Sequence, residues 1–172
     1  MATEEDWGSY LAAVVDMAPP GRDPFRIEPD TPGHTGSWPE GVPTPVVVVT
    51  AWNPDSVVLD PEVNRARHAR LVAELDRSGL AHWPATGRDP ESAHHEVGLA
   101  VPGLTVEQGA ALGRRHGQAA VYRWTPDAWT VISCTDDRRR TTGWRLTRYG
   151  PGATLGPPRG GATGRAARHR CP

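Results

Sequence analysis

The residues with the clearest chemical potential form short polar clusters at the ends of predicted strands. His94 and Glu96 are two positions apart, so on a strand their side chains point to the same face. A histidine beside a carboxylate can exchange protons near neutral pH, with the carboxylate orienting or tuning the imidazole. Asn53 and Ser56 follow the apolar run at 46–49 and add hydrogen-bonding groups. These types and spacings indicate an acid–base pair or a set of polar ligand contacts.

Several other kinds of site are not supported by the residues present. Adjacent histidines on a strand face opposite sides, so His94 and His95 cannot share an ion, and a third ligand beside His94 and Glu96 is lacking. We therefore predict no metal. Ser56 lacks the Gly-x-Ser-x-Gly setting of a nucleophile, and Cys134 ends a buried-type strand, where a thiol is usually inert. No phosphate loop or Gly-x-Gly-x-x-Gly fingerprint is present, so we predict no cofactor.

Hydrophobic periodicity and cap residues predict the elements that must position these side chains. They are a strand over 46–52, a helix over 60–78, strands over 82–86 and 96–101, a helix over 105–117, and strands over 119–124 and 129–134. With right-handed crossovers, this order predicts an α+β fold, the ferredoxin-like βαββαβ plait. Its antiparallel sheet carries two helices on one face, an added C-terminal strand extends the sheet, and a short helix over 7–17 precedes the core.

In such a plait the polar clusters converge at one edge of the sheet, where the first two core strands end and the next two begin. We therefore expect a pocket in which His94 and Glu96 are the catalytic candidates. The ligand-binding candidates around them are Trp52, Asn53, Ser56, Asn64, Gly87, Gln118 and Arg114. Free N–H groups at the start of the first core helix would suit an anion. The alternative is structural: these side chains satisfy loop N–H groups, pack, or cap turns.

Charge and composition divide the chain into three parts. Residues 1–44 carry eight acids and two arginines, a net −6, and form a helix and an acidic Pro/Gly-rich loop. Residues 45–134 carry a net −2 and form the core domain. Residues 135–172 carry two acids and nine arginines, a net +7, and read as a mostly disordered Arg/Gly/Pro-rich tail. That tail could bind nucleic acid through phosphates, or meet the acidic N-terminal segment.

The ends of the sequence and its cysteines indicate the compartment. The N-terminus is rich in Glu and Asp and lacks the basic-then-apolar layout of a signal peptide. No apolar run approaches the roughly 20 residues of a membrane span. The chain has 2 cysteines, which do not form a disulfide framework. We expect a cytoplasmic protein without a membrane partner and with reduced thiols.

One run of motifs resembles a known family. Thr50-Ala51-Trp52-Asn53-Pro54 follows the valine strand, and further matches occur in order and spacing along the chain. These matches are Asn64, Gly87, His94-x-Glu96, Ala110, Leu112 and Gln118-x-Ala120. The segment from Val46 to Trp124 resembles the bacterial family known as domain of unknown function 3293, and Trp7-x-x-Tyr10-Leu11 is similar to its opening helix. The family has no established activity, so the resemblance implies a fold unit and no reaction. The long Arg-rich ending departs from the family's short one.

Three hypotheses follow. The first is a small binding or regulatory domain whose polar sheet-edge pocket holds a small polar or anionic ligand, or a partner segment. The second is a small enzyme in which His94 and Glu96 form an acid–base pair, while Asn53, Asn64 and Gln118 position the substrate. The third is nucleic-acid binding through the basic tail. The sequence predicts neither a specific ligand nor an oligomeric state.

Overall fold

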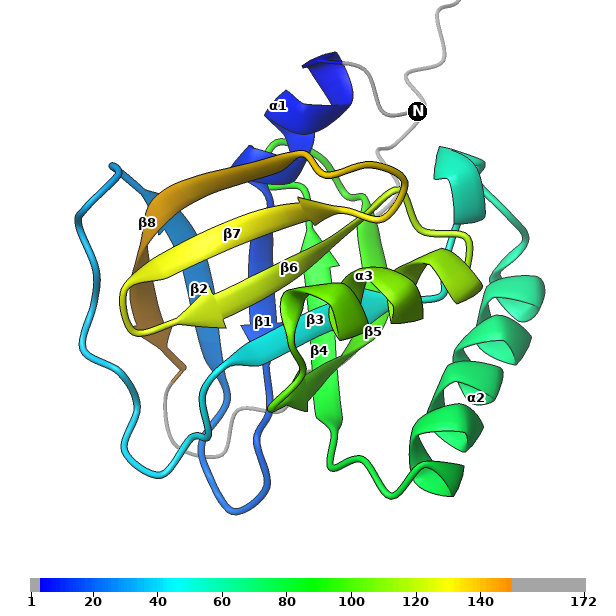
Figure 1. Cartoon of the computed structure of the whole chain (residues 1–172), viewed down its shortest axis with the longest axis horizontal. Helices are drawn as coiled ribbons and strands as arrows, with labels where there is room; N and C mark the ends of the chain where they lie inside the picture. Colours follow the sequence, from blue (N-terminus) through cyan, green and yellow to red (C-terminus); the bar gives the residue numbers. More distant parts are fainter. Residues whose placement is uncertain (1–3, 150–172) are drawn as a thin grey trace, which may run out of the picture.

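The computed structural model describes residues 4–149 of the chain. In chain order its elements are α1 (Glu4–Ala12), β1 (Val14–Met17), β2 (Phe25–Asp30), β3 (Val46–Thr50), the 3-10 turn η1 (Pro54–Ser56), α2 (Pro61–Arg77), β4 (Trp83–Arg88), β5 (His95–Pro102), α3 (Val106–Arg115), β6 (Ala120–Thr125), β7 (Ala128–Ser133) and β8 (Arg139–Arg148) (Figure 1). The predicted caps are confirmed, since Asp60 caps α2 and Thr105 with Gln108 forms a capping box on α3. Within this part of the chain, no helix is long and apolar enough to cross a membrane.

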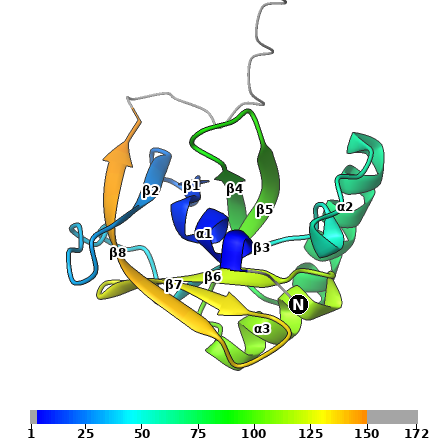
Figure 2. The ribbon, with the colours of Figure 1, turned by 90° about the horizontal axis from the view of Figure 1, so that it is seen from above.

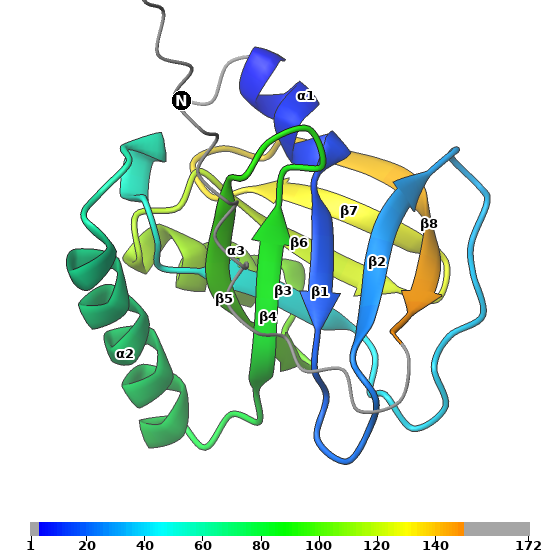
Figure 3. The same ribbon diagram turned by 180° about the vertical axis from the view of Figure 1, so that it is seen from behind.

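The eight strands form one closed antiparallel barrel. Their order is β1-β2-β8-β7-β6-β3-β5-β4, and β4 pairs back onto β1 (Figure 3). The predicted fold, an open ferredoxin-like plait with two helices on one face, is therefore wrong. Strands from the two ends of the chain continue the sheet and join its edges. Closure pairs the backbone groups that an open sheet would leave exposed along those edges.

One half of the barrel keeps the strand order of a βαββαβ unit. In β6-β3-β5-β4, each neighbouring pair is antiparallel, and the crossovers are α2 and α3. The ends of β3 and β4 and the starts of β5 and β6 therefore lie at the same end of the barrel. This local pairing brings the predicted polar clusters together although the predicted fold was wrong.

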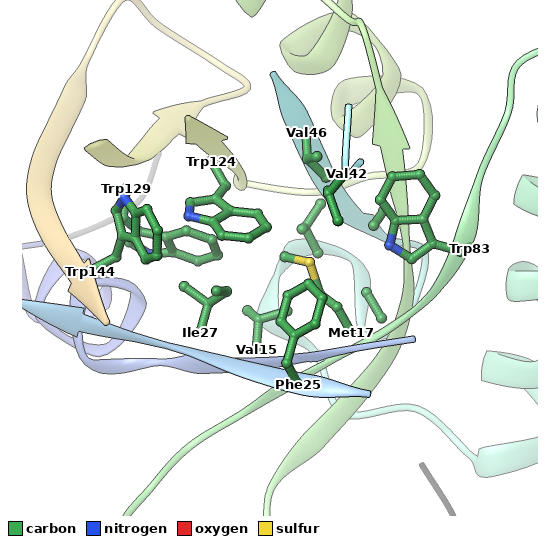
Figure 4. Close-up of a cluster of buried hydrophobic side chains, with 13 residues drawn as sticks. Val15, Met17, Phe25, Ile27, Val42, Val46, Trp83, Trp124, Trp129 and Trp144 are labelled. Atoms are coloured by element: carbon green, nitrogen blue, oxygen red, sulfur yellow. The ribbon is translucent and has the colours of Figure 1, made fainter. Parts of the chain in front are cut away.

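Two apolar clusters lie on the two sides of the barrel wall. Along β3, Val46 and Val48 face the interior, whereas Val47 and Val49 face outward toward the helices. The interior cluster contains Val15, Met17, Phe25, Ile27, Val42, Val46, Val48, Trp83, Ala85, Ala100, Trp124, Trp129 and Trp144 (Figure 4). The outer cluster packs β3 and β5 against Leu71 and Leu75 of α2 and Leu112 of α3. The valine run is buried on both faces because alternate valines pack into the two different clusters.

The N-terminal segment differs from the predicted helix over 7–17. Helix α1 ends at Ala12, and the β-branched pair Val14-Val15 begins β1, which pairs with both β2 and β4. The helical spacing of the apolar residues was misleading because pairing on both sides of the strand determines its conformation. Phe25, Arg26 and Ile27, which belong to the predicted N-terminal loop, lie in β2.

The basic C-terminal segment also differs from the prediction. Arg139–Arg148 forms β8, which pairs with β7 and β2, and Trp144 is fully buried in the interior. Several of its arginines meet acids: Arg138 and Arg140 lie 3.7 and 3.9 Å from Glu4, and Arg145 lies 2.6 Å from Glu28. The rest of the predicted tail, residues 150–172, lies outside the described residues.

A buried carboxylate joins the strands that close the barrel. Asp16 of β1 is 2% exposed and accepts hydrogen bonds from Arg26 of β2 at 2.7 Å and Arg88 of β4 at 2.6 Å. The Tyr149 hydroxyl, just beyond β8, also donates to it. Although burial opposes the effect, these hydrogen bonds lower the pKa of Asp16 below its ordinary value. One charge thus ties together three strands and the residue that follows a fourth.

The two ends of the barrel are covered differently. Helix α1 lies over the end where β3 and β4 finish (Figure 2). At the end of β6 farthest from α1, the connection between β2 and β3 packs against the interior cluster. There Val42 is buried, and the Trp38 ring lies 4.0 Å from the Trp124 ring. The loop residues fill this end with apolar side chains, whereas the end beneath α1 is lined in part by polar side chains.

Candidate functional site

A pocket of about 560 Å³ lies between α1 and the barrel end beneath it. Its wall comes from α1, the ends of β3 and β4, the starts of β5 and β6, and the segment after β3. Small residues on the strands leave the space open, among them Gly87, Gly98 and Ala120. The polar side chains in the wall are Ser9, Tyr10, Thr50, Asn53, Ser56, Arg88, Asp89, Glu91, His94, Glu96, Gln118 and Tyr122. Eight-stranded barrels are wide enough to hold one small ligand in this position.

Asn53 is the most constrained of these side chains. Its Oδ1 accepts hydrogen bonds from Asn64 Nδ2 at 2.8 Å and from the Leu59 backbone N–H at 3.1 Å. Its own backbone N–H donates to Asn64 Oδ1 at 3.0 Å. Because Leu59 N–H can only donate, the amide orientation is fixed, and Nδ2 points to Glu96 Oε1 at 2.9 Å. Asn53 also has φ 46 and ψ 56, a left-handed conformation that asparagine tolerates better than most residues.

Glu96 presents a carboxyl group to the pocket from β5. Its Oε1 accepts from Asn53 and lies 3.5 Å from His94 Nε2. Burial raises the pKa of Glu96, while the Asn53 hydrogen bond and the nearby His94 oppose that rise. His94 is half exposed and lies at the pocket rim. His94 and Glu96, the predicted acid–base pair, are therefore close enough to exchange a proton between Nε2 and Oε1.

Two tyrosines complete the pocket wall near Glu96. Tyr10 comes from α1, and burial raises its phenol pKa, with an opposing hydrogen bond from Ser56 and a further increase from the Glu96 charge. Tyr122 comes from β6, where its ring stacks on Trp129 with centroids 5.0 Å apart. Burial also raises the pKa of Tyr122, and the charges of Tyr10 and Glu96 add to the effect. Both phenols therefore stay neutral at physiological pH, in the same pocket wall as the partly buried carboxyl group of Glu96.

The segment after β3 is held by partners from β5, from α2 and from the loop that precedes β6. Thr50 Oγ1 donates to the Val97 carbonyl at 2.8 Å and accepts from Trp52 N–H at 3.0 Å. The Trp52 carbonyl accepts from Gln118 Nε2 at 2.8 Å. Arg67 of α2 donates to the Ala51 carbonyl at 2.8 Å. These hydrogen bonds fix the backbone from Thr50 to Pro54, and this backbone positions Asn53 in the pocket wall.

The structure brings together most of the predicted site residues, whose functional roles stay predictions. The residues that line the pocket are Asn53, Ser56, Gly87, His94, Glu96 and Gln118. Asn64 lies behind them and positions Asn53. Trp52 contributes its backbone, and its ring lies 5.9 Å from His95. Arg114 does not line the pocket; it is exposed on α3 and donates to the Cys134 carbonyl at 2.6 Å.

The start of α2 does not provide the free N–H groups that were expected for an anion. The Asp60 side chain caps the Glu62 N–H at 2.7 Å, and the Asp60 carbonyl accepts from the Asn64 N–H at 3.0 Å. None of Asp60, Glu62 and Asn64 lines the pocket. A carboxylate at the cap would also repel an anionic group.

Sequence reasoning missed the two tyrosines and, of the small residues in the wall, Gly98 and Ala120, whereas Gly87 was predicted. Tyr122 could have been found from strand alternation, because Gln118, Ala120 and Tyr122 share one face of the segment that enters β6. Tyr10 lies within the helix that was predicted over 7–17, and no role in the site was predicted for it. Only the closed barrel shows that this helix covers a pocket.

The possible metal ligands and the one described cysteine were compared with the requirements for metal and thiol chemistry. No group of three or more histidine, cysteine, aspartate or glutamate side chains between residues 4 and 149 could hold a metal ion. Cys134 is buried, and burial raises the pKa of its thiol to about 11. A thiol with such a pKa stays protonated and weakly nucleophilic at neutral pH.

The fold and the site define a small closed-barrel domain with a polar pocket at one end. Residues 49–121 match a family model described as a protein of unknown function (DUF3293). The resemblance that the TAWNP segment predicted is therefore confirmed over these residues. No curated protein and no solved structure matches the chain. The matched segment includes Asn53, Asn64, Glu96 and Gln118, whereas α1 and Tyr10 lie outside it.

Proposed function

We propose that this protein is a small ligand-binding domain whose barrel end beneath α1 holds one small polar molecule. The observation that carries the proposal is the pocket itself. It combines about 560 Å³ of space with a few convergent polar groups, as ligand sites in barrels do. The opposite end is filled by apolar side chains from the β2–β3 connection, so the polar groups are confined to the α1 end.

The rigidity of the pocket supports a binding role. Asn53 and Gln118 are fixed by hydrogen bonds to Asn64, Leu59 and the Trp52 carbonyl before any ligand arrives. A preformed site loses little conformational entropy when it binds, so more of the contact energy appears as affinity. The network places Asn53 against Glu96 inside the pocket, which a purely structural network would not require.

Filling the pocket tests the proposal. Gly87 lies in the wall opposite Glu96 in the β4–β5 ladder, and a Cβ built there meets no atom within 4 Å. Gly87→Leu should therefore fold normally and occupy the ligand space. A library of small polar metabolites is screened against the wild type by native mass spectrometry, and Kd values of the hits are measured for both proteins. We expect Gly87→Leu to weaken binding at least about tenfold.

The matched control is Ala69→Leu, which adds the same side chain at an exposed position of α2 outside the pocket. It should leave Kd unchanged, and circular dichroism should show both variants folded. Hits that bind Gly87→Leu as tightly as the wild type would place the binding site elsewhere.

A second candidate, a small enzyme, is favoured by the position of His94 beside the buried carboxyl of Glu96, 3.5 Å away. In that case a bound molecule is also converted. Glu96→Gln should then slow turnover by about 10²-fold or more while binding partly survives. Equal loss of binding and turnover would argue for recognition alone.

A further inference from the structure

We propose that the pocket selects a ligand with a protonated amine or amidinium group, and that Glu96 Oε2 is the acceptor that binds it. This inference rests on the proposed binding function and specifies its ligand class. It replaces the anionic ligand that the sequence suggested. Four features of the described residues carry it.

The first feature is that the two carboxyl oxygens of Glu96 differ in their hydrogen-bond partners. Asn53 and His94 both meet Oε1, at 2.9 and 3.5 Å. Between residues 4 and 149, no side chain or backbone group donates to Oε2. One oxygen is thus held in place by an amide whose orientation is fixed, and the other is an unused acceptor, among the described residues, on a side chain that lines the pocket. Because Oε2 keeps its acceptor capacity, a ligand with a hydrogen-bond donor can bind to it.

The second feature is the empty space beside that oxygen. Gly87 is the direct partner of Glu96 in the β4–β5 ladder, and Gly98 follows two residues later on the same face of β5. No side chain from these positions covers the carboxyl group. A ligand group can therefore reach Glu96 directly.

The third feature is the sign of the charges around the pocket. Among the described wall residues, the carboxyl groups belong to Asp89, Glu91 and Glu96, and the guanidinium belongs to Arg88. Arg88 is already paired, since its Nε donates to Asp16 Oδ2 at 2.6 Å. An anionic ligand would meet three carboxyl groups and no uncommitted arginine in this wall. A cation would meet complementary charge.

The fourth feature is the aromatic wall. Tyr10 and Tyr122 both line the pocket, and the charge of Glu96 adds to the rise in the pKa of both phenols that burial causes. Aromatic rings attract cations as well as apolar groups, and they do so most strongly where water is excluded. A carboxylate beside aromatic rings is the arrangement expected for binding an organic cation, in which the rings contact the carbon frame.

A set of three probes of nearly equal shape tests the inference: benzamidine, which is cationic; benzamide, which is neutral; and benzoate, which is anionic. Their binding to the wild type, Glu96→Gln and Gly87→Leu is measured by saturation-transfer NMR titration at pH 7.5. We expect the wild type to bind benzamidine at least about tenfold tighter than benzamide, the effect of one charge-assisted hydrogen bond, and to bind benzoate more weakly than either.

The variants separate the two proposals. Glu96→Gln keeps an oxygen that can accept from Asn53, so it should fold and bind benzamidine and benzamide within about twofold of each other. Gly87→Leu should weaken all three probes. Binding of benzamide or benzoate as tight as that of benzamidine, lost in Gly87→Leu, would overturn the cationic class but keep the ligand pocket. Probe binding that Gly87→Leu leaves unchanged would overturn both, and no benzamidine binding would overturn the cationic class.

Discussion

At the residue scale, Glu96 combines features that oppose stability with features that favour recognition. Its carboxyl group is largely buried, shares one oxygen with Asn53 and His94, and leaves the other free within the described chain. Burying a charge without a full set of partners is unfavourable. A side chain held in such a state is better explained by what it binds than by what it stabilises.

This reasoning gives a stability prediction for Glu96→Gln. A carboxyl whose folded pKa is raised contributes stability that is fully present below its ordinary value of 4.5 and is lost as pH rises through the folded pKa. Glutamine does not ionise and can still accept from Asn53. The variant should therefore melt at a temperature equal to or higher than that of the wild type at pH 7. The two curves should converge below pH 4.5.

Thermal unfolding followed by circular dichroism between pH 4 and pH 8 measures this. Glu62→Gln, at an exposed position in the first turn of α2, provides the control for a simple change of net charge. A melting temperature several degrees lower for Glu96→Gln at pH 7 would show that the carboxylate stabilises the fold, contrary to our interpretation.

At the element scale, β3 and β5 approach each other closely where the pocket begins. A Cβ built on Gly98 would lie 2.5 Å from the Val49 carbonyl oxygen, a backbone atom that cannot move independently. The same construction at Gly87, on the neighbouring strand, meets nothing within 4 Å. The two glycines therefore have different roles: Gly98 permits the strands to pair, and Gly87 leaves space for the pocket.

Substitution by alanine distinguishes these roles. Gly98→Ala should destabilise the protein by about 1–3 kcal/mol because the strands must separate to fit the methyl group. Gly87→Ala should change the free energy of unfolding little, or stabilise the protein by up to about 1 kcal/mol through a less flexible unfolded chain. Urea unfolding of the two variants beside the wild type measures both values. Equal effects at the two positions would contradict the assigned roles.

The elements of the central segment could be predicted because their signals are local. The Asp60-Pro61 start and the Thr105–Gln108 capping box define two helices, and the valine run defines a buried strand. Asn53 and Glu96 could be predicted to meet because the βαβ order of the central segment puts the end of β3 and the start of β5 at the same edge of the sheet. Tyr10 could not be placed, since it reaches the pocket only when strands from both chain ends pair with each other.

At the scale of the whole molecule, closure of the barrel depends on contacts between segments far apart in sequence. In β8, inward-facing Trp144 is surrounded by arginines and threonines, so composition indicated a disordered tail rather than a strand. In β1, only four residues bridge β2 and β4. Such strands acquire their structure from partners, and nothing in their own sequence identifies those partners.

Asp16→Asn tests closure. Removing the carboxylate leaves Arg26 and Arg88 without their buried partner, so we expect a loss of about 2–4 kcal/mol at neutral pH. Because the pKa of Asp16 is lowered, its contribution is full above the ordinary value of 3.8 and is lost as pH falls through the folded pKa. The difference between wild type and variant should therefore narrow in that acidic range.

Chemical unfolding at a series of pH values checks this, with Asp127→Asn in the exposed β6–β7 turn as the control. That variant should lie within about 0.5 kcal/mol of the wild type. A gap for Asp16→Asn that stays constant down to the lowest pH would show that the carboxylate's charge does not hold the closing strands.

The strand order has a practical consequence for how the protein is divided for expression. The segment matching the family, residues 49–121, contains β4 and β5 in full but only the last two residues of β3 and the first two of β6, while β1, β2, β7 and β8 come from the flanking sequence. A fragment trimmed to the matched residues would leave β4 without β1 and the start of β6 without β7. Both would become open edges that invite aggregation. The matched segment is thus smaller than the barrel whose edges it would leave open.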